Sequence, residues 1–166
     1  MKRKFLALLM LLILVCTALP ALAATPDYQA TADFLDALNE KGIEYTFNGI
    51  DSDGDENVTV HITTDEYGSA TFQFYFSGGG RYLAARVWNV IDFDIADRAA
   101  VLEICNKANY DYRFCCFYVD DTDNSVTMSV DACLPSSDSG SISADLLEVM
   151  HTLLKHVYPN LTVYNH

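Results

Sequence analysis

Apolar and polar residues alternate in four consecutive segments between residues 45 and 88, which is the period of β-strands with one buried face. In the third segment, phenylalanine occupies every second position, with Gln73 and Tyr75 between the three rings. Residues typical of turns separate the segments, namely Asp53-Gly54, Glu66-Tyr67-Gly68 and Gly78-Gly79. The pattern therefore predicts an antiparallel meander of four strands.

The same turns predict how neighbouring strands pair. The predicted pairs are Phe47 with Val60, Ile62 with Phe72, and Phe74 with Leu83. With this register every apolar stripe lies on one face of the sheet, and a slip of one residue at any turn would break that agreement. We therefore expect the meander to bury one face and to leave the other open.

Three segments show the 3.6-residue period of helices. They cover residues 25–42, 96–110 and 143–159. Thr25 and Ser143 have the residue type of N-caps, while Gly42 and Pro159 are expected to end the first and the last helix. A polar loop over residues 135–140 precedes the last helix.

A second hairpin is predicted between the last two helices, with strands in residues 113–119 and 125–134. The length of its loop decides which side chains of the first strand face the core. A four-residue loop directs Cys115, Phe117 and Val119 inward, whereas a three-residue loop directs Phe114, Cys116 and Tyr118 inward. We prefer the four-residue loop.

The order of the predicted elements is α-β-β-β-β-α-β-β-α. This order is typical of an α+β fold in which an antiparallel sheet has its helices on one face. Residues 24–166 contain no repeat and no low-complexity tract, and their number suits a single domain.

The first 23 residues have the composition of a secretory signal peptide. Three basic residues precede an apolar run over residues 5–19, and small residues follow up to Ala23. The run is shorter than the roughly 20 residues that span a bilayer. We expect cleavage after Ala23 and export of the remainder; the alternatives are an uncleaved anchor and a lipoprotein signal at Cys16.

Charge narrows the classes of partner. The chain has 23 Asp and Glu against 10 Lys and Arg, a net charge of −13, and three of the ten bases lie in the expected signal peptide. This balance repels phosphate backbones and anionic lipids, so nucleic acids and membrane surfaces are disfavoured as partners. With 51% hydrophobic residues, the chain is globular rather than disordered.

Several short motifs resemble the YbjN family. Residues 103–110 (EICNKANY) carry Asn106 and Asn109 near the end of a helix, residues 117–120 (FYVD) end a strand, and Tyr158-Pro159 closes the last helix. The resemblance covers about residues 34–164. It implies a bacterial protein with a fold similar to that of type III secretion chaperones. The family's label, sensory transduction regulator, names no established biochemical activity.

Two acidic turns are candidates for a metal site. Residues 51–57 (DSDGDEN) begin like a calcium loop, but Glu56 and Ile62 stand where an EF-hand needs a glycine and a bidentate acid. Residues 120–123 form a similar acidic turn. We interpret both as solvated hairpin turns and expect neither a metal nor a cofactor. Weak calcium binding, in an acidic calcium-responsive module, is the alternative.

The cysteines are candidates for redox or nucleophilic chemistry. Four lie outside the expected signal peptide: Cys105, Cys115, Cys116 and Cys133. Export permits disulfides, and either Cys105–Cys115 or Cys116–Cys133 is an alternative to the free buried thiols that we expect. No general base can be placed beside a thiol, so we assign no catalytic residue and do not expect an enzyme. An envelope hydrolase is the least favoured hypothesis.

The face opposite the phenylalanines gathers aromatic and polar side chains. In the predicted register Tyr75 pairs with Tyr82 and Thr71 pairs with Arg86, while Trp88 follows on the same face. Aromatic residues and arginine on an open surface are typical of recognition sites. We expect Tyr75, Tyr82, Arg86 and Trp88 to bind a protein or peptide, or a second copy of the chain. The competing interpretation is ordinary cross-strand packing.

Overall fold

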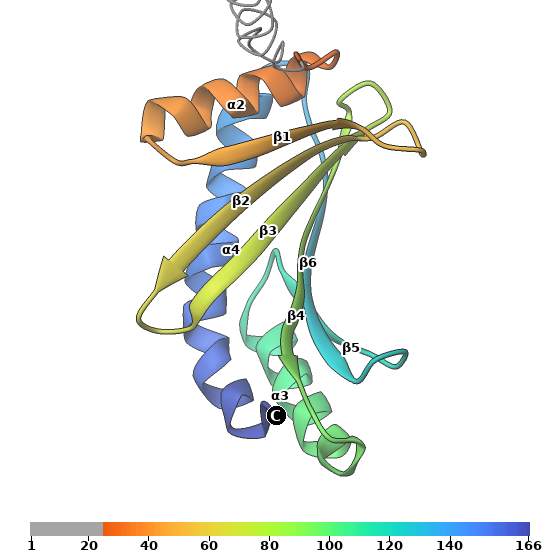
Figure 1. Cartoon of the computed structure of the whole chain (residues 1–166), viewed down its shortest axis with the longest axis vertical. Coiled ribbons are helices and arrows are strands. Elements are labelled where there is room, and N and C mark those ends of the chain that lie inside the picture. Colours follow the sequence, from red (N-terminus) through yellow and green to blue (C-terminus); the bar gives the residue numbers. More distant parts are fainter. Residues whose placement is uncertain (1–24) are drawn as a thin grey trace, which may run out of the picture.

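The computed structural model of the chain describes residues 25–166 (Figure 1). The predicted signal peptide, residues 1–23, lies outside the described residues. The helices and strands are α2 (Gln29–Lys41), β1 (Tyr45–Ile50), β2 (Glu56–Thr64), β3 (Gly68–Ser77), β4 (Tyr82–Asp92), α3 (Arg98–Asp111), β5 (Cys116–Asp120), β6 (Ser125–Cys133) and α4 (Ser139–Leu161). Short 3₁₀ turns at Ile95–Asp97 and Thr162–Tyr164 precede α3 and follow α4. The α+β class and the predicted order of elements are confirmed.

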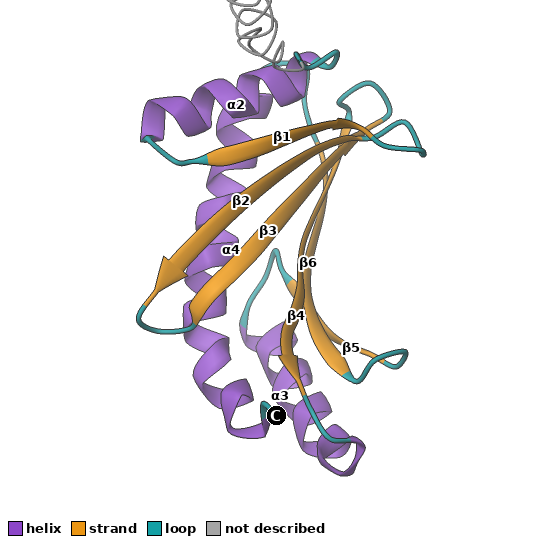
Figure 2. Cartoon of the chain, viewed as in Figure 1, coloured by secondary structure: helices purple, strands orange, loops and turns teal. Residues whose placement is uncertain are grey.

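All six strands form one antiparallel sheet in the order β1-β2-β3-β4-β6-β5 (Figure 2). The second hairpin joins the meander through β6, its later strand, so β5 lies at the edge. Asp120 pairs with Ser125, which leaves four residues in the loop. Cys115 and Phe117 are buried and Cys116 is exposed, so the preferred four-residue loop is confirmed.

The predicted partners of the apolar residues in the meander are wrong by two residues in each of the three strand pairs. The observed pairs are Phe47 with Val58, Val60 with Phe72, and Phe74 with Ala85. Side chains in a strand alternate with a period of two, so a shift of two residues changes each partner and keeps each face. The prediction that the apolar stripes share one face therefore holds.

The side chain of Asp51 explains one residue of the shift between β1 and β2, and a bulge between Phe47 and Gly49 adds the other. Its Oδ1 atom accepts hydrogen bonds from the backbone N–H groups of Asp53 and Asp55, at 2.9 and 3.0 Å. These bonds stabilise a longer turn between Ile50 and Glu56 than the two-residue turn that the Asp-Gly pair predicts.

The core lies between the apolar face of the sheet and the helices. Helix α4 crosses behind β1, β2 and β3 (Figure 1), and α2 packs against α4. The ring of Phe34 in α2 lies 4.7 Å from the ring of Phe74 and 5.6 Å from that of Phe76, between centroids. The largest fully buried side chains are Phe34, Phe72, Phe74, Phe76, Phe117, Leu38, Leu83, Ile91, Met128, Leu147, Met150 and Leu154.

Helix α2 begins later than predicted because its first turn is capped from another element. Tyr28 is the N-cap and makes no capping hydrogen bond with its own side chain. The buried carboxylate of Glu56, in β2, accepts hydrogen bonds from the backbone N–H groups of Asp27 and Tyr28. The prediction that Thr25 caps this helix is therefore wrong, since a residue 28 positions away satisfies the free N–H groups.

Helix α4 begins at Ser139, four residues before the predicted N-cap Ser143. The hydroxyl of Ser139 donates to Asp33 of α2 at 3.0 Å. A Cβ atom at Gly140 would lie 2.4 Å from the backbone oxygen of Asp33, so only glycine permits this crossing of the helices. The contact with α2 extends the helix into the predicted loop.

Of the two predictions for where a helix ends, one is confirmed and the other is wrong. Gly42 has φ of 68° and ends α2 in the left-handed conformation, as predicted. Pro159 does not end α4, which continues to Leu161. Leu161 is fully buried, and this burial stabilises the last turn despite the proline. Among residues 25–166, no helix has both the length and the apolar character needed to cross a bilayer.

Candidate partner-binding face

The four predicted binding residues all lie on the face of the sheet away from the core. In β4, Tyr82, Arg86 and Trp88 alternate with buried Leu83, Ala85 and Val87. In β3, Tyr75 lies between the buried Phe74 and Phe76. Trp88 is 44% exposed and Tyr82 is 49% exposed, so two aromatic rings of this face are open to solvent. A partner could therefore contact both rings without any movement of the helices.

Gln73 joins two of these residues. Its Oε1 atom accepts a hydrogen bond from Trp88 Nε1 at 3.1 Å and another from the hydroxyl of Tyr75. In the observed register Gln73 lies opposite Arg86, whereas the predicted register had placed Thr71 opposite Arg86. Gln73 was not predicted as a site residue, because only the correct register brings its amide between the two rings.

The other two predicted residues are held elsewhere on the face. Arg86 Nη2 lies 2.7 Å from Asp131 Oδ1, and Nη1 donates to the carbonyl of Val130 at 2.9 Å. Tyr82 pairs with Cys133 and not with Tyr75. Trp88 follows Tyr82 by six positions in β4, about 20 Å along the strand. The four residues therefore share a face but do not form one cluster.

The sheet splits beside Trp88. Pairing between β3 and β4 ends at Gln73 and Arg86, after which Gly68–Phe72 pairs only with β2. In β4, Val87, Ile91 and Asp92 pair only with β6, and the residues between Val87 and Ile91 have no partner in either strand. The two strands diverge from their shared hairpin in Figure 1. A bulge with Asn89 in the left-handed conformation, at φ of 50°, bends β4 at this point.

A cavity of about 240 Å³ lies in this split. Ser69 and Thr71 line it from β3, Trp88 and Val90 line it from β4, and Tyr67 also contributes to its wall. Helix α4 contributes Leu154 and Tyr158, so the cavity extends from the open face toward the helix layer. We use the name "split" for the gap between Gly68–Phe72 of β3 and Val87–Asp92 of β4 together with this cavity.

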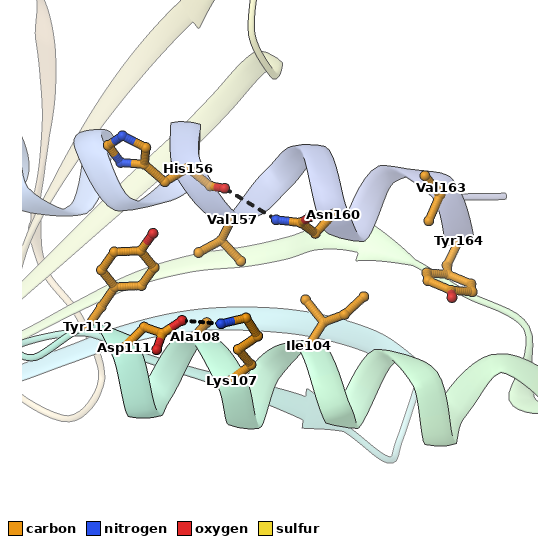
Figure 3. Close-up of a pocket in the computed structure, with 10 residues that line it drawn as sticks. All are labelled: Ile104, Lys107, Ala108, Asp111, Tyr112, His156, Val157, Asn160, Val163 and Tyr164. Carbon is orange, nitrogen blue, oxygen red and sulfur yellow. Dashed lines mark hydrogen bonds and ion pairs between the residues drawn. The ribbon is translucent and has the colours of Figure 1, made fainter.

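A second cavity, of about 360 Å³, lies between α3 and the end of α4 (Figure 3). Its apolar residues include Ile104, Ala108 and Val157. The ring of His156 stacks on that of Tyr112, with centroids 6.3 Å apart. An ion pair between Lys107 and Asp111, with 2.5 Å between nitrogen and oxygen, lies at its polar side. This groove combines apolar contact area with a few polar groups, and it was not predicted from the sequence.

In both acidic turns an aspartate carboxylate accepts hydrogen bonds from nearby groups of the same hairpin. Asp51 accepts backbone hydrogen bonds through Oδ1 and a bond from Asn57 Nδ2 through Oδ2, and these bonds, the one from Asp55 foremost, lower its pKa. In the second turn, Asp120 accepts from the hydroxyl and the backbone N–H of Thr122, which likewise lowers its pKa. Residues 25–166 contain no group of three or more His, Cys, Asp or Glu side chains placed to hold a metal ion.

The four cysteines are free in the structure, two buried and two exposed. Cys105 and Cys115 face the core, whereas Cys116 and Cys133 lie on the open face. Neither of the two disulfides that the sequence left open is formed. Burial raises the pKa of Cys105 to about 11 and that of Cys115 to about 12, so both are protonated thiols at neutral pH.

Asn109 connects α3 to the edge strand β5. Its Nδ2 atom donates to the carbonyl of Phe117 at 2.8 Å, and its Oδ1 atom accepts from the N–H of the same residue at 2.7 Å. Both asparagines of the motif are exposed, so it is these two bonds to the backbone, and not burial, that distinguish Asn109 from Asn106. The motif therefore has a structural role. The side-chain amide of Asn109 bonds the backbone of Phe117 as a neighbouring strand would, at the edge of the sheet.

The comparisons with known proteins agree with these motifs. A model of the YbjN family, described as "Putative bacterial sensory transduction regulator", matches residues 31–154. This match spans α2 to most of α4 and so covers the whole sheet. A search of the curated proteins finds no match.

Proposed function

The chain belongs to the YbjN family, and on that premise we propose that it is a non-catalytic domain that binds a protein or peptide through the open face of its sheet. The observation that carries the proposal is the position of Trp88. A large aromatic ring stays 44% exposed while Gln73 holds its indole N–H. Rigid, exposed aromatic residues are the groups that dominate binding energy at protein interfaces.

The surroundings of Trp88 support the same proposal. Tyr75 shares the amide of Gln73, and Arg86 is held by Asp131 within the same face. These side chains are fixed before a partner binds, so little conformational entropy is lost on association. A regulator, the role in the family's description, can act through such a binding surface alone.

We further propose that the domain acts outside the bacterial cytoplasmic membrane. The proposal rests on residues 1–23, with their basic start, apolar run and small residues before the expected cleavage site. The exported domain would carry 23 acidic and seven basic residues. This charge disfavours nucleic acids and anionic membrane surfaces as partners and leaves proteins and peptides as the favoured class.

Photo-crosslinking in intact cells tests the binding face. Benzoylphenylalanine replaces Trp88 or Tyr75 in the full chain, and Tyr110 serves as the matched aromatic control because it lies on α3 and is 89% exposed. We expect a protein adduct, or a dimer of the chain, from positions 88 and 75 and none from position 110. Equal adducts at all three positions, or none at positions 88 and 75, would show that the open face is not the binding surface.

A further inference from the structure

Building on the proposed function, we propose that the split between β3 and β4 receives an extended segment of the partner. This segment pairs with the free edge of β4 as an added strand, places an apolar side chain in the cavity, and carries basic residues on either side of it. The proposal rests on the direction of the backbone groups at the split, on the size of the cavity and on the surrounding charge.

The C-terminal end of β4 shows which way its backbone groups point. The N–H of Asp92 donates to Asn165 Oδ1 at 3.2 Å, and its carbonyl accepts from the N–H of His166 at 3.1 Å. The N–H of Phe93 instead donates to the carbonyl of Asn124, on the side of β6. Asp92 therefore directs both of its backbone groups away from β6.

The alternation of an antiparallel strand extends this result to Val90. Residues two apart direct their N–H and C=O groups to the same side, and Ile91 between them pairs with Val126 of β6. The carbonyl of Val90 lies across a trans peptide from the Ile91 N–H and thus faces the split, where pairing with β3 has already ended. A free strand edge of this kind is a template for an added strand.

Asn165 and His166 occupy the far end of this edge. Asn165 and His166 contact Asp92, while the cavity begins at Trp88, Asn89 and Val90. The edge therefore already accepts one extended segment, and the stretch beside the cavity stays open to another.

The cavity fits an apolar side chain of the added strand. Its volume of about 240 Å³ exceeds the roughly 150 Å³ that encloses a benzene ring. Leu154, Val87 and Ala70 give it apolar walls. The buried hydroxyl of Tyr67, which also lines it, has no hydrogen-bond partner among the described residues and is free to donate to a backbone carbonyl.

Charge favours a basic segment. The residues that line the cavity are uncharged, and Asp92 adjoins one end of it in sequence. Glu66 adjoins the other end and is paired with Lys155 at 2.7 Å. Seven of the ten bases lie in residues 25–166, and five of them are already paired with carboxylates of this chain. Residues 25–166 carry 23 acidic and seven basic residues, so the net charge of the domain attracts an incoming Lys or Arg and repels an incoming acid.

Trp88 is the only tryptophan of the chain, so its fluorescence reports on the split. The probe is an octapeptide of alternating Lys and Val with blocked ends. The controls are the Glu-Val octapeptide and a Lys-Val octapeptide whose backbone is N-methylated at every second residue. We expect the Lys-Val peptide to shift the emission of Trp88 saturably, the Glu-Val peptide to leave it unchanged, and N-methylation to weaken binding by about tenfold or more, the effect of one lost hydrogen bond.

Two lysine substitutions locate the binding. Ser69→Lys places a positive charge in the lining of the split, and Thr46→Lys makes the same change on the edge strand β1, which β2 separates from β3. We expect Ser69→Lys to weaken binding of the Lys-Val peptide about tenfold more than Thr46→Lys does. Equal effects of the two substitutions, no saturable shift with the Lys-Val peptide, or unaltered binding of the N-methylated peptide would each overturn the inference.

The experiments can refute the binding face and strand addition at the split independently of each other. Adducts from positions 88 and 75 in cells, together with no response of Trp88 to the Lys-Val peptide, would leave the open face as a binding surface and refute strand addition at the split. Peptide binding at the split without any adduct in cells would refute the proposed function.

Discussion

Trp88 Nε1 lies 3.1 Å from Gln73 Oε1, so a side-chain hydrogen bond spans β3 and β4 where their backbones have stopped pairing. The last backbone pair is Gln73 with Arg86, two residues before Trp88. The bond thus fixes the indole at the entrance of the split. An exposed ring that would otherwise move freely has one position from which to bind a partner.

Replacing Gln73 by alanine is expected to release Trp88. The variant loses one hydrogen bond to the indole and one to the hydroxyl of Tyr75, at a cost of about 1–2 kcal/mol in unfolding free energy. Quenching of Trp88 fluorescence by acrylamide should increase. Asn48→Ala is the control, because it removes a bond to Thr59 on the same face, at 2.9 Å, away from Trp88. If both variants quench alike, Gln73 does not position the ring.

The two asparagines of the family motif should differ sharply. Asn109→Ala removes both hydrogen bonds to the backbone of Phe117, so we expect a loss of about 2–3 kcal/mol in unfolding free energy, measured by urea denaturation. Asn106 is exposed, so Asn106→Ala should change stability by less than about 0.5 kcal/mol. Similar losses in the two variants would contradict the role assigned to Asn109.

Gly140→Ala tests the crossing of α2 and α4. Alanine favours a helix over glycine by about 1 kcal/mol, but its Cβ atom would lie 2.4 Å from the backbone oxygen of Asp33. We expect a net destabilisation of about 1–3 kcal/mol by thermal or urea unfolding, because the helices must move apart. The control is Ser141→Ala at an exposed position of the same turn. A stabilised Gly140→Ala protein would show that the helices are not in close contact here.

The thiols should react in two classes. Cys116 and Cys133 are exposed and should react rapidly with an aromatic disulfide reagent at pH 8. Cys105 and Cys115 are buried, and burial raises their pKa to about 11 and about 12, so they should react only after unfolding. A Cys116→Ser, Cys133→Ser protein should show no rapid reaction. Fewer than four thiols in the unfolded wild-type domain would instead indicate a disulfide.

His151 should make stability fall on mild acidification. Its ring lies edge-on to Tyr67, with centroids 5.8 Å apart, and burial lowers its pKa below the ordinary 6.5, with a further contribution from the charge of Lys155. Glu66 opposes this shift. The unfolded chain therefore binds a proton at higher pH than the native protein, and stability is lost as pH falls from about 6.5 through the lower native value.

Urea unfolding at pH 7.5 and pH 5.5 measures this effect. His151→Gln should lose less stability between the two conditions than the wild-type protein. His61→Gln, at an exposed position on the open face, is the control and should lose as much as the wild type. Equal losses in all three proteins would exclude His151 as the group responsible.

The candidate site could be predicted only in part from the sequence. Alternation along β3 and β4 placed Tyr75, Tyr82, Arg86 and Trp88 on one face, because the side-chain period of a strand is two in any register. It did not find the link through Gln73. That link depends on which residues lie opposite one another, and each predicted pairing was displaced by two residues.

The amino-acid sequence alone determined the fold class, the order of the elements, the apolar face of the sheet and the family. These follow from local periodicity and short motifs, which each segment carries by itself. Tertiary structure decided the pairing of β6 with β4, the capping of α2 by Glu56, the early start of α4 at Ser139, and the split beside Trp88. Each of these depends on contacts between residues far apart in the chain, whose free energy is gained only when the elements pack together and which no local pattern records.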